Sequence, residues 1–386
     1  MDADVAIIGT GTMGSMAAWQ IARRGVSVIA FDQYAPGHDR SGAGGESRIF
    51  RTAYKEGSKY VPLLLRAREL WRELEAATGV PLLTLNGGLM IGRDTLPGMV
   101  NVLATVEQFG LDHEILSPAQ VIERFPVHQL DPGEIALLDK AAGYLKPELA
   151  VLTAAAEAER RGARILRYTA IRDIEADANG VTVYSDNRSW RVGKLLVTAG
   201  AWTRNLLVNS VDDHEVVRIV LGWYVPKRPE LFTPEAFPIF IRENDEIDFC
   251  GWPMINGTSV KIGRNGSHGV YPDAESVERW VDPAWMVRWK RMVERYLPEL
   301  HPHPVRIGVY MDGWTDSGDP FIGAQPELPN TFSMYGFSGH GFKMAPALGE
   351  IAADLVTGVT PAFDLAPFAI PPGRSTSSVP RQMFMP

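Results

Sequence analysis

Apolar positions near the N-terminus follow two different spacings, which predict a strand, a helix and a second strand. Residues 5–8 form a short apolar run that is typical of a buried strand. Small and apolar residues within 17–22 fall on one face of a helix, and Gly25 ends that helix. Residues 26–30 are again mostly apolar and predict the second strand. The chain therefore begins with a strand–helix–strand unit.

The turn between the first strand and the helix has the G-x-G-x-x-G spacing, formed by Gly9, Gly11 and Gly14. Such glycines allow a tight turn and let a pyrophosphate approach the helix N-terminus. Asp32 follows the second strand, where an acid accepts a hydrogen bond from an adenosine ribose. The fingerprint alone does not separate NAD from FAD. Its position at the start of the chain, without a second comparable glycine fingerprint, favours bound FAD.

Later segments continue the alternation of helices and strands. The apolar spacing and the turn residues predict a helix over 147–162, a strand over 164–168 and a hairpin over 171–183. Residues 194–198 form an apolar strand that ends in a small-residue turn at Gly200. This turn either passes close to the dinucleotide or is an ordinary strand end, and the segment alone favours neither interpretation.

Segments 80–145 and 210–305 differ from the rest of the chain. They hold short strands, many prolines and a capped helix at 117–125. We therefore predict an α/β (mixed α+β) fold, in which a discontinuous Rossmann-like domain is interrupted by a substrate domain. The FAD-binding domain is expected to comprise 1–82, 146–210 and 306–370, the substrate domain 83–145 and 211–305, and a mobile Pro/Ser-rich tail 371–386.

The overall composition is that of a soluble globular protein with a large core. Of the 386 residues, 45% are hydrophobic and 22% are charged. The net charge is −8, from 38 basic and 46 acidic residues, which argues against nucleic acid or an anionic membrane as the main partner. The basic segment 285–296 has apolar residues at helical spacing after an Asp282-Pro283 start, so it predicts an amphipathic helix against the core.

Cysteine and histidine usage gives no sign of a disulfide framework or a metal site. Cys250 is the only cysteine, and His301 and His303 lie in a Pro-rich loop without nearby carboxylate or cysteine ligands, so we expect no metal. No apolar run approaches the roughly 20 residues that a membrane span needs. The N-terminus leads directly into the first strand and leaves no room for a signal peptide. A cytoplasmic enzyme fits these features best.

The stretch "YGFSGHGFKMAPALGE", residues 335–350, crowds Gly336, Gly339 and Gly341 ahead of an apolar, helix-like run. Glycines at a helix entrance let backbone N–H groups approach an electron-rich group. The stretch itself does not identify that group.

Several segments resemble the monomeric sarcosine oxidase and N-methyltryptophan oxidase family of FAD-dependent amine oxidases, in order along nearly the whole chain. They are "GTGTMGSMAAWQIARRG", "GGESRIFRTAYKEGSKYVPLLLRARELW", "VTAGAW", "VKIG", "GFSGHGFKMAPALGEIAADL" and "FDLAPF". The resemblance implies an FAD-binding domain beside a substrate domain with a mainly antiparallel mixed sheet. It also implies oxidation of a secondary or tertiary amino acid to an imine, with oxygen taking the electrons to give hydrogen peroxide.

The resemblance also assigns roles to charged residues. Arg51 and Lys343 match the pair that binds the substrate carboxylate, and a guanidinium with an ammonium suits that task. Arg48 matches an arginine beside the flavin ring, and Lys261 the lysine where oxygen is activated. Amides from Gly339 to Phe342 would stabilise charge on the reduced ring. Further cofactor-binding positions are Gly45, Gly200 and Gly341, and further substrate-binding positions are Cys250, Asn265 and His340, the last of which equally suits simple packing.

The sequence departs from the family in the pocket and at the flavin attachment point. Tyr310 stands where some members link FAD through a cysteine, so we expect non-covalent FAD. Residues 43–46 lack both histidines of the sarcosine enzymes. Cys250 replaces a pocket tyrosine, and Asn265 lies where a pocket histidine is expected. The carboxylate clamp is kept while its surroundings change, so a substrate larger or more polar than sarcosine is expected.

Other functions share part of these features. A dehydrogenase on the same fold would pass electrons to a quinone or another protein, but Lys261 favours an oxidase. A catalytically silent flavin-binding partner protein is disfavoured because Arg51, Lys261 and Lys343 are all kept. An NAD-dependent dehydrogenase shares only the N-terminal fingerprint. The expected partners are a small amine and oxygen, with the protein a monomer or homodimer.

Overall fold

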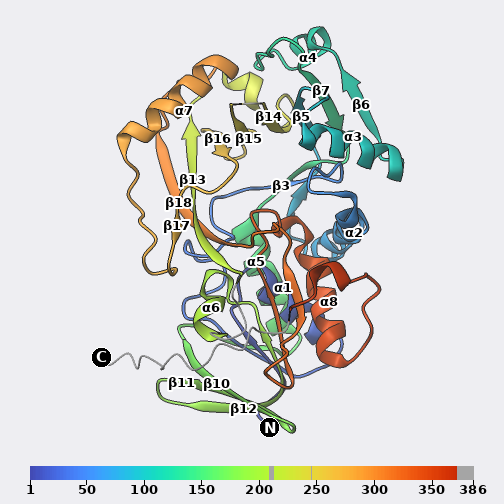
Figure 1. Cartoon of the computed structure of the whole chain (residues 1–386), viewed down its shortest axis with the longest axis vertical. Coiled ribbons are helices and arrows are strands. Elements are labelled where there is room, and N and C mark those ends of the chain that lie inside the picture. The colour runs from blue at the N-terminus through green and yellow to red at the C-terminus, as the bar shows by residue number, and fades with distance from the viewer. Residues whose placement is uncertain (208–212, 245, 372–386) are drawn as a thin grey trace.

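The computed structural model describes residues 1–207, 213–244 and 246–371, and two large sheets lie at its opposite ends (Figure 1). The N-terminal strand belongs to the lower sheet. The upper sheet combines strands of the two inserted segments with β18 (Arg306–Trp314), which was expected in the FAD-binding domain. The mixed α/β class is confirmed. The predicted tail lies, except for its first residue, outside the described residues. No helix in the described ranges is both long and apolar enough to cross a bilayer.

The lower sheet is built around the predicted strand–helix–strand unit. β1 (Ala3–Ile8) lies between β2 (Val28–Phe31) and β12 (Ser189–Val197), and all three run parallel. Ligands bind at the carboxyl ends of such strands, where the glycine turn now lies. The remaining strands of this eight-stranded sheet are β9 (Arg164–Leu166), β10 (Ile171–Asp177), β11 (Gly180–Ser185), β19 (Phe321–Ala324) and β20 (Thr331–Tyr335).

Helices cover one face of the lower sheet. They are α1 (Thr12–Ala22), α5 (Pro147–Arg160) and α8 (Ala345–Thr357), and α2 (Val61–Thr78) packs on α8. Every residue of α1 from Met13 to Ala22 is buried, so the core surrounds this helix on all sides. α1 and α8 approach closely at Gly349, where an added Cβ would lie 2.7 Å from backbone atoms of Met16.

The upper sheet is mixed and mainly antiparallel, as the resemblance implied. Among its described strands, the parallel pairing is that of β14 (Ile239–Glu243) with β5 (Gly88–Gly92). The other strands of this nine-stranded sheet are β6 (His113–Leu116), β7 (Ile135–Asp139), β13 (Glu215–Tyr224), β15 (Asp248–Trp252), β16 (Val260–Arg264), β17 (Val270–Tyr271) and β18 (Arg306–Trp314).

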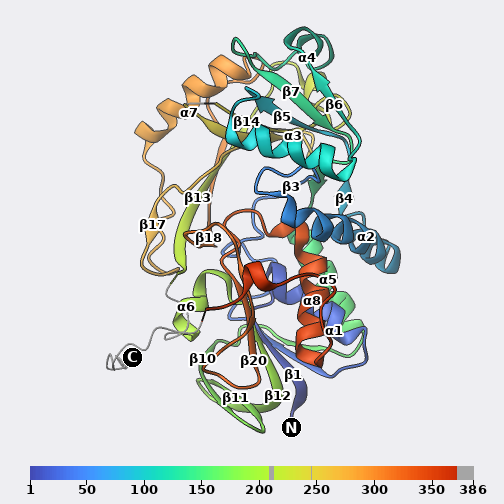
Figure 2. The ribbon, with the colours of Figure 1, turned by 45° about the vertical axis from the view of Figure 1, so that its right-hand side comes forward.

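Helices also flank the upper sheet (Figure 2), and α4 (Pro118–Arg124) and α7 (Pro283–Tyr296) begin at the predicted signals. α4 starts with a capping box between Ser117 and Gln120. α7 starts where the Asp282 side chain accepts the Ala284 N–H, and it buries an apolar face as predicted. α3 (Pro97–Phe109) is another of these helices.

A small three-stranded sheet lies between the two large ones (Figure 2). It pairs β3 (Arg48–Phe50) with β8 (Gly143–Leu145), and β8 with β4 (Leu83–Thr84). β3 carries Arg48, and Arg51 follows its end, so both arginines lie between the large sheets.

Candidate cofactor and substrate site

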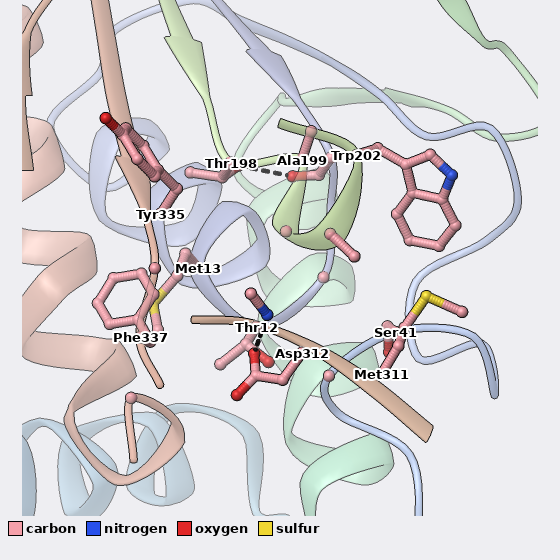
Figure 3. A pocket seen from close by; sticks show the side chains of 18 of the residues that line it. Thr12, Met13, Ser41, Thr198, Ala199, Trp202, Met311, Asp312, Tyr335 and Phe337 are labelled. Atoms are coloured by element: carbon pink, nitrogen blue, oxygen red, sulfur yellow. Dashed lines mark hydrogen bonds between the residues drawn. The ribbon is translucent and has the colours of Figure 1, made fainter. Parts of the chain in front are cut away.

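A cavity of about 2240 Å³ runs between the two large sheets. The carboxyl ends of β1 and β2 line one part of it, and β15, β16 and the loop after β3 line another. Figure 3 shows a section of the wall, where Thr12 and Met13 of α1 lie near Asp312 of β18 and Phe337 of the glycine-rich stretch. A cavity formed by so many distant segments suits an extended ligand such as a dinucleotide.

The predicted glycine turn forms the part of the cavity at β1. Gly9 has a φ of +91°, and an added Cβ would lie 2.6 Å from the Thr198 carbonyl oxygen. A Cβ on Gly14 would lie 1.8 Å from the Gly9 carbonyl oxygen, because α1 packs directly on this turn. A Cβ on Gly11 would meet only the Ser41 Cβ, at 4.0 Å, although Gly11 lines the cavity. The turn thus leaves space for a ligand at the α1 N-terminus.

Thr198 joins β12 to this turn and was not predicted as a site residue. Its hydroxyl donates to the carbonyl oxygens of Gly9, at 2.8 Å, and Ile8, at 3.2 Å. The chain then passes along the cavity at Ala199 and Gly200 before the short α6 (Thr203–Leu206). Gly200 thus lines the cavity, and its contact with a dinucleotide stays a prediction.

Asp32 is held rigidly at the tip of β2. Its Oδ2 accepts hydrogen bonds from the backbone N–H of Thr10, at 2.9 Å, and from the Thr10 hydroxyl, at 2.8 Å. Its Oδ1 accepts the backbone N–H of Tyr34 at 2.9 Å. The Nε2 of His38 lies 3.9 Å from Oδ1 of Asp32, and burial lowers the pKa of this imidazole. The carboxylate lines the cavity in a fixed orientation, where the ribose of a dinucleotide is expected.

The C-terminal glycine-rich stretch forms a loop along the cavity before η4 (Phe342–Met344) and α8. Gly336 and Gly339 adopt φ values of +74° and +84°, which favour glycine. The Gly339 N–H donates to Oδ2 of Asp312 at 2.7 Å, and burial raises the pKa of that carboxyl. No sequence pattern indicated that Asp312 would lie here. The Gly339 amide is therefore engaged by the protein itself.

Arg48 lies inside a loop of carbonyl groups. Its guanidinium donates to the carbonyl oxygens of Ser47 at 2.8 Å, Gly42 at 2.8 Å and Gly44 at 2.5 Å. Burial lowers the pKa of this guanidinium. Arg48 lines the cavity, so its charge is available to a bound anionic group while the loop holds it in place.

Lys261 holds the same loop from the other side and does not itself line the cavity. Its Nζ donates to the carbonyl oxygens of Gly45, at 2.9 Å, and Ser47, at 2.5 Å. The ring of Trp252, which does line the cavity, has its centroid 3.7 Å from this Nζ. Burial, and then the charge of Arg48, set the pKa of Lys261 well below its usual value.

Glu148 completes the support of this loop and was also not predicted. It lies in the first turn of α5, and its Oε1 accepts the N–H groups of Gly45 at 2.6 Å and Glu46 at 2.9 Å. Glu46 has a φ of +68°, an uncommon value for a residue with a side chain. An acid in the first helical turn was the available signal, but nothing in the sequence indicated its partners.

Arg51 forms an ion pair with Glu56 in the part of the cavity that β15, β16 and the loop after β3 line; we call this the substrate part. Its Nη2 donates to both Glu56 carboxylate oxygens, at 2.7 and 2.6 Å, and its Nη1 to the Ala53 carbonyl oxygen at 3.2 Å. Its Nε is buried without a partner. Burial raises the pKa of Glu56, but nearby cations, Arg51 first, outweigh this effect and lower it to about 2. The predicted carboxylate clamp thus already holds a carboxylate of its own.

Lys343 lies beside Arg51 and forms hydrogen bonds with neutral groups. Its Nζ donates to the His340 carbonyl oxygen at 2.8 Å and to the Tyr54 hydroxyl at 3.4 Å. The two ring nitrogens of His340 lie 2.9 Å from the Tyr54 hydroxyl and 3.0 Å from the Gly318 carbonyl oxygen. Because protein groups occupy both nitrogens, the structure favours a supporting role for His340 over direct substrate binding.

Polar side chains lie around the rest of the substrate part of the cavity. Cys250 and Asn265 line it, as do Lys55 and Asp248, which were not predicted. Asp248 forms an ion pair with Lys55 at 2.8 Å and accepts a hydrogen bond from the Asn265 amide. Burial raises the pKa of the Cys250 thiol to about 12, so this cysteine stays protonated. Polar and charged groups therefore line the cavity together with Arg51.

These features fit an FAD molecule. The glycine turn and the α1 N-terminus suit its pyrophosphate, Asp32 its adenosine ribose, and Arg48 the electron-rich flavin ring. The polar part of the cavity at Arg51 remains for a small substrate.

Comparisons with known proteins agree with this assignment. A family model described as FAD dependent oxidoreductase matches residues 4–355. The chain is 34% identical to monomeric sarcosine oxidase from Streptomyces avermitilis, over 92% of this chain and 94% of that protein. It is 32% identical to N-methyl-L-tryptophan oxidase from Salmonella heidelberg, over 96% of this chain and 99% of that protein.

Solved structures share the fold at lower identity. NikD, described as an unusual amino acid oxidase essential for nikkomycin biosynthesis, has a TM-score of 0.86 at 22% identity, covering 98% of this chain and 99% of its own. Glycine oxidase from Geobacillus kaustophilus has a TM-score of 0.80 at 21% identity, covering 96% of this chain and 98% of its own. The chain therefore belongs to the FAD-dependent oxidoreductase family and is a flavoenzyme similar to the sarcosine and N-methyltryptophan oxidases.

Proposed function

We propose that this protein oxidises a secondary or tertiary (N-alkyl) amino acid, or a related amine, to an imine that then hydrolyses, and that oxygen receives the electrons as hydrogen peroxide. Bound FAD would supply the two-electron chemistry. The observation that carries the proposal is the meeting of Arg48, Arg51 and Lys343, from both ends of the chain, along the cavity that begins at the glycine turn. The relatives named above are oxidases of amino acids, which supports the same reaction type.

The side chains at Arg51 would bind and orient the substrate. Its carboxylate would join Arg51 and Lys343, while Glu56 gives up part of its hold on the guanidinium. A desolvated site with two cations disfavours an additional positive charge, so the amine binds in its neutral form. The polar wall of Lys55, Asp248 and Asn265 supports a substrate with a larger or more polar side chain than sarcosine.

Oxygen as the electron acceptor is tested by Lys261→Met. We expect anaerobic reduction of the flavin by substrate to continue, with reoxidation by oxygen slowed by about ten-fold or more, because a buried amine near the flavin can stabilise developing superoxide. Stopped-flow absorbance measures both steps. Lys261→Arg is the control, because it can keep hydrogen bonds to Gly45 and Ser47. Unchanged reoxidation in the Met variant would favour a dehydrogenase that uses another acceptor.

Non-covalent attachment of FAD is supported by the surroundings of Tyr310. Its ring lines the cavity and packs against Gly44, where an added Cβ would lie 2.5 Å from the ring. The only cysteine, Cys250, is in β15 rather than β18. We expect acid or heat denaturation to release all the yellow cofactor into the supernatant. Flavin that precipitates with the polypeptide would contradict this expectation.

A further inference from the structure

Lys343 is a buried lysine without a counter-ion. Its side chain is 6% exposed, and no carboxylate forms an ion pair with it among the residues that the structure describes. Glu56, the nearby acid, directs both oxygens to Arg51 instead. A second cation beside Arg51 without a carboxylate of its own is costly to keep charged in a desolvated site.

The hydrogen bonds around Lys343 have a forced direction. His340 places Nε2 against the Gly318 carbonyl oxygen, so Nε2 carries the hydrogen and Nδ1 is an acceptor. The Tyr54 hydroxyl therefore donates to Nδ1 and presents an oxygen lone pair to Lys343. The His340 carbonyl oxygen accepts the second hydrogen bond from Nζ.

This pattern leaves one tetrahedral position of Nζ for the cavity, which Lys343 lines. In a neutral amine both N–H bonds point to the Tyr54 and His340 acceptors, so the nitrogen lone pair occupies the remaining position. In the ammonium form a third N–H occupies it. The same atom can thus accept a proton from a ligand and then donate a hydrogen bond to it.

Burial and the charges around Lys343 bring the pKa of its ammonium near neutral pH. Burial, and then Arg51, lower the pKa of its ammonium to about 7. Arg48 lowers it further, whereas Glu56 and Cys250 raise it. Burial lowers the pKa of the His340 imidazole to about 4, so His340 is neutral and adds no charge. A large fraction of the protein therefore holds Lys343 as the free amine at pH 7–8.

We propose that Lys343 accepts the proton of the substrate ammonium as the zwitterionic amino acid enters the site. The inference rests on the proposed function. The substrate N–H⁺ bond breaks and an Nζ–H bond forms, so that R₂NH₂⁺ and Lys–NH₂ become R₂NH and Lys–NH₃⁺. The new ammonium and Arg51 then bind the substrate carboxylate, and the amine keeps a free lone pair for oxidation. No proton needs to leave the closed site, and Tyr54 and His340 are positioning residues for the exchange.

The test compares two probes of similar size on the FAD-loaded protein, without oxygen and at pH 8. Methoxyacetate has a carboxylate but no ionisable nitrogen, and N,N-dimethylglycine is a zwitterion. Binding is read by stopped flow from the spectrum of the oxidised flavin, before any amine reduces it, and proton uptake from a pH indicator in weak buffer. We expect close to one proton taken up per methoxyacetate bound, and close to none per N,N-dimethylglycine, because that ligand brings its own proton.

The pH profiles give a second readout. Above pH 7 the Kd of methoxyacetate should rise towards ten-fold per pH unit, since its binding needs the protonated lysine. The Kd of N,N-dimethylglycine should stay flat until its own ammonium titrates. In Lys343→Arg, which stays charged, methoxyacetate should bind without proton uptake and with a flat profile. Tyr54→Phe removes an acceptor of the Lys343 ammonium and so lowers its pKa. The rise in the Kd of methoxyacetate should therefore begin at a lower pH.

The possible failures are distinguishable. Methoxyacetate that binds the unmodified protein without proton uptake would overturn the inference and leave the carboxylate clamp intact. Equal proton uptake in Lys343→Arg would also overturn it, because another group would then be the acceptor. Protein that binds neither probe would contradict the clamp, and with it the proposed function.

Discussion

Replacing Gly14 with alanine is expected to give a colourless protein that no longer binds FAD. The added methyl group would lie 1.8 Å from the Gly9 carbonyl oxygen and 2.7 Å from the Thr198 hydroxyl oxygen. Backbone cannot move aside as a flexible side chain can, so the start of α1 must shift away from β1 and the phosphate turn is lost. FAD titration followed by protein fluorescence, with circular dichroism for the fold, measures both consequences.

Gly11→Ala is the matched control for this change. Its methyl group would meet only the Ser41 Cβ, at 4.0 Å, so the FAD-free protein should keep its fold and melting temperature. Because Gly11 lines the cavity at the α1 N-terminus, the methyl group should still obstruct the pyrophosphate and raise the Kd for FAD by about ten-fold or more. Normal FAD binding by both variants would show that the turn does not hold the cofactor.

Replacing Arg51 with alanine is expected to remove most of the affinity for amino acid carboxylates. Loss of one partner of a buried charge pair costs about 2–5 kcal/mol, which corresponds to about 30-fold to several-thousand-fold in Kd. The loss is enlarged because Glu56 would then be unpaired beside Lys343, where a carboxylate must bind. Anaerobic stopped-flow titration with N,N-dimethylglycine, read from the oxidised flavin before its reduction, measures the Kd.

Glu56→Gln separates the clamp from its internal ion pair. This variant keeps Arg51 but removes the carboxylate that competes for its Nη2. We expect the Kd for the same ligand to fall by about ten-fold, since the incoming carboxylate no longer meets a like charge. If both variants weaken binding equally, the ion pair maintains the shape of the site and Arg51 is not the carboxylate receptor.

Local patterns predicted the elements of this fold well. The strand–helix–strand unit, the hairpin at β10 and β11, and the starts of α4 and α7 follow from residue spacing and from caps within a few positions. Such signals are local, so they survive in the folded chain. The order of strands in the two sheets could not be predicted from local patterns, because it depends on contacts between segments that are far apart in the sequence.

The site was predicted less completely for the same reason. Arg48, Arg51 and Lys343 were found through a resemblance, and the structure brings them to one cavity. Their partners were missed. Glu148 supports the loop at Gly45 from a helix about a hundred positions away, and no local pattern connects the two segments. Hydrogen bonds from buried side chains to backbone carbonyls, like those of Lys261, leave no signal in the sequence at all.

The most direct test of the proposed activity mixes the FAD-loaded protein with a panel of N-alkyl amino acids without oxygen, and then admits air. We expect at least one amine to bleach the visible flavin band. Air should then restore the band, with one hydrogen peroxide formed for each amine oxidised. Flavin that stays oxidised with every N-alkyl amino acid, in protein that binds FAD, would contradict the proposed function.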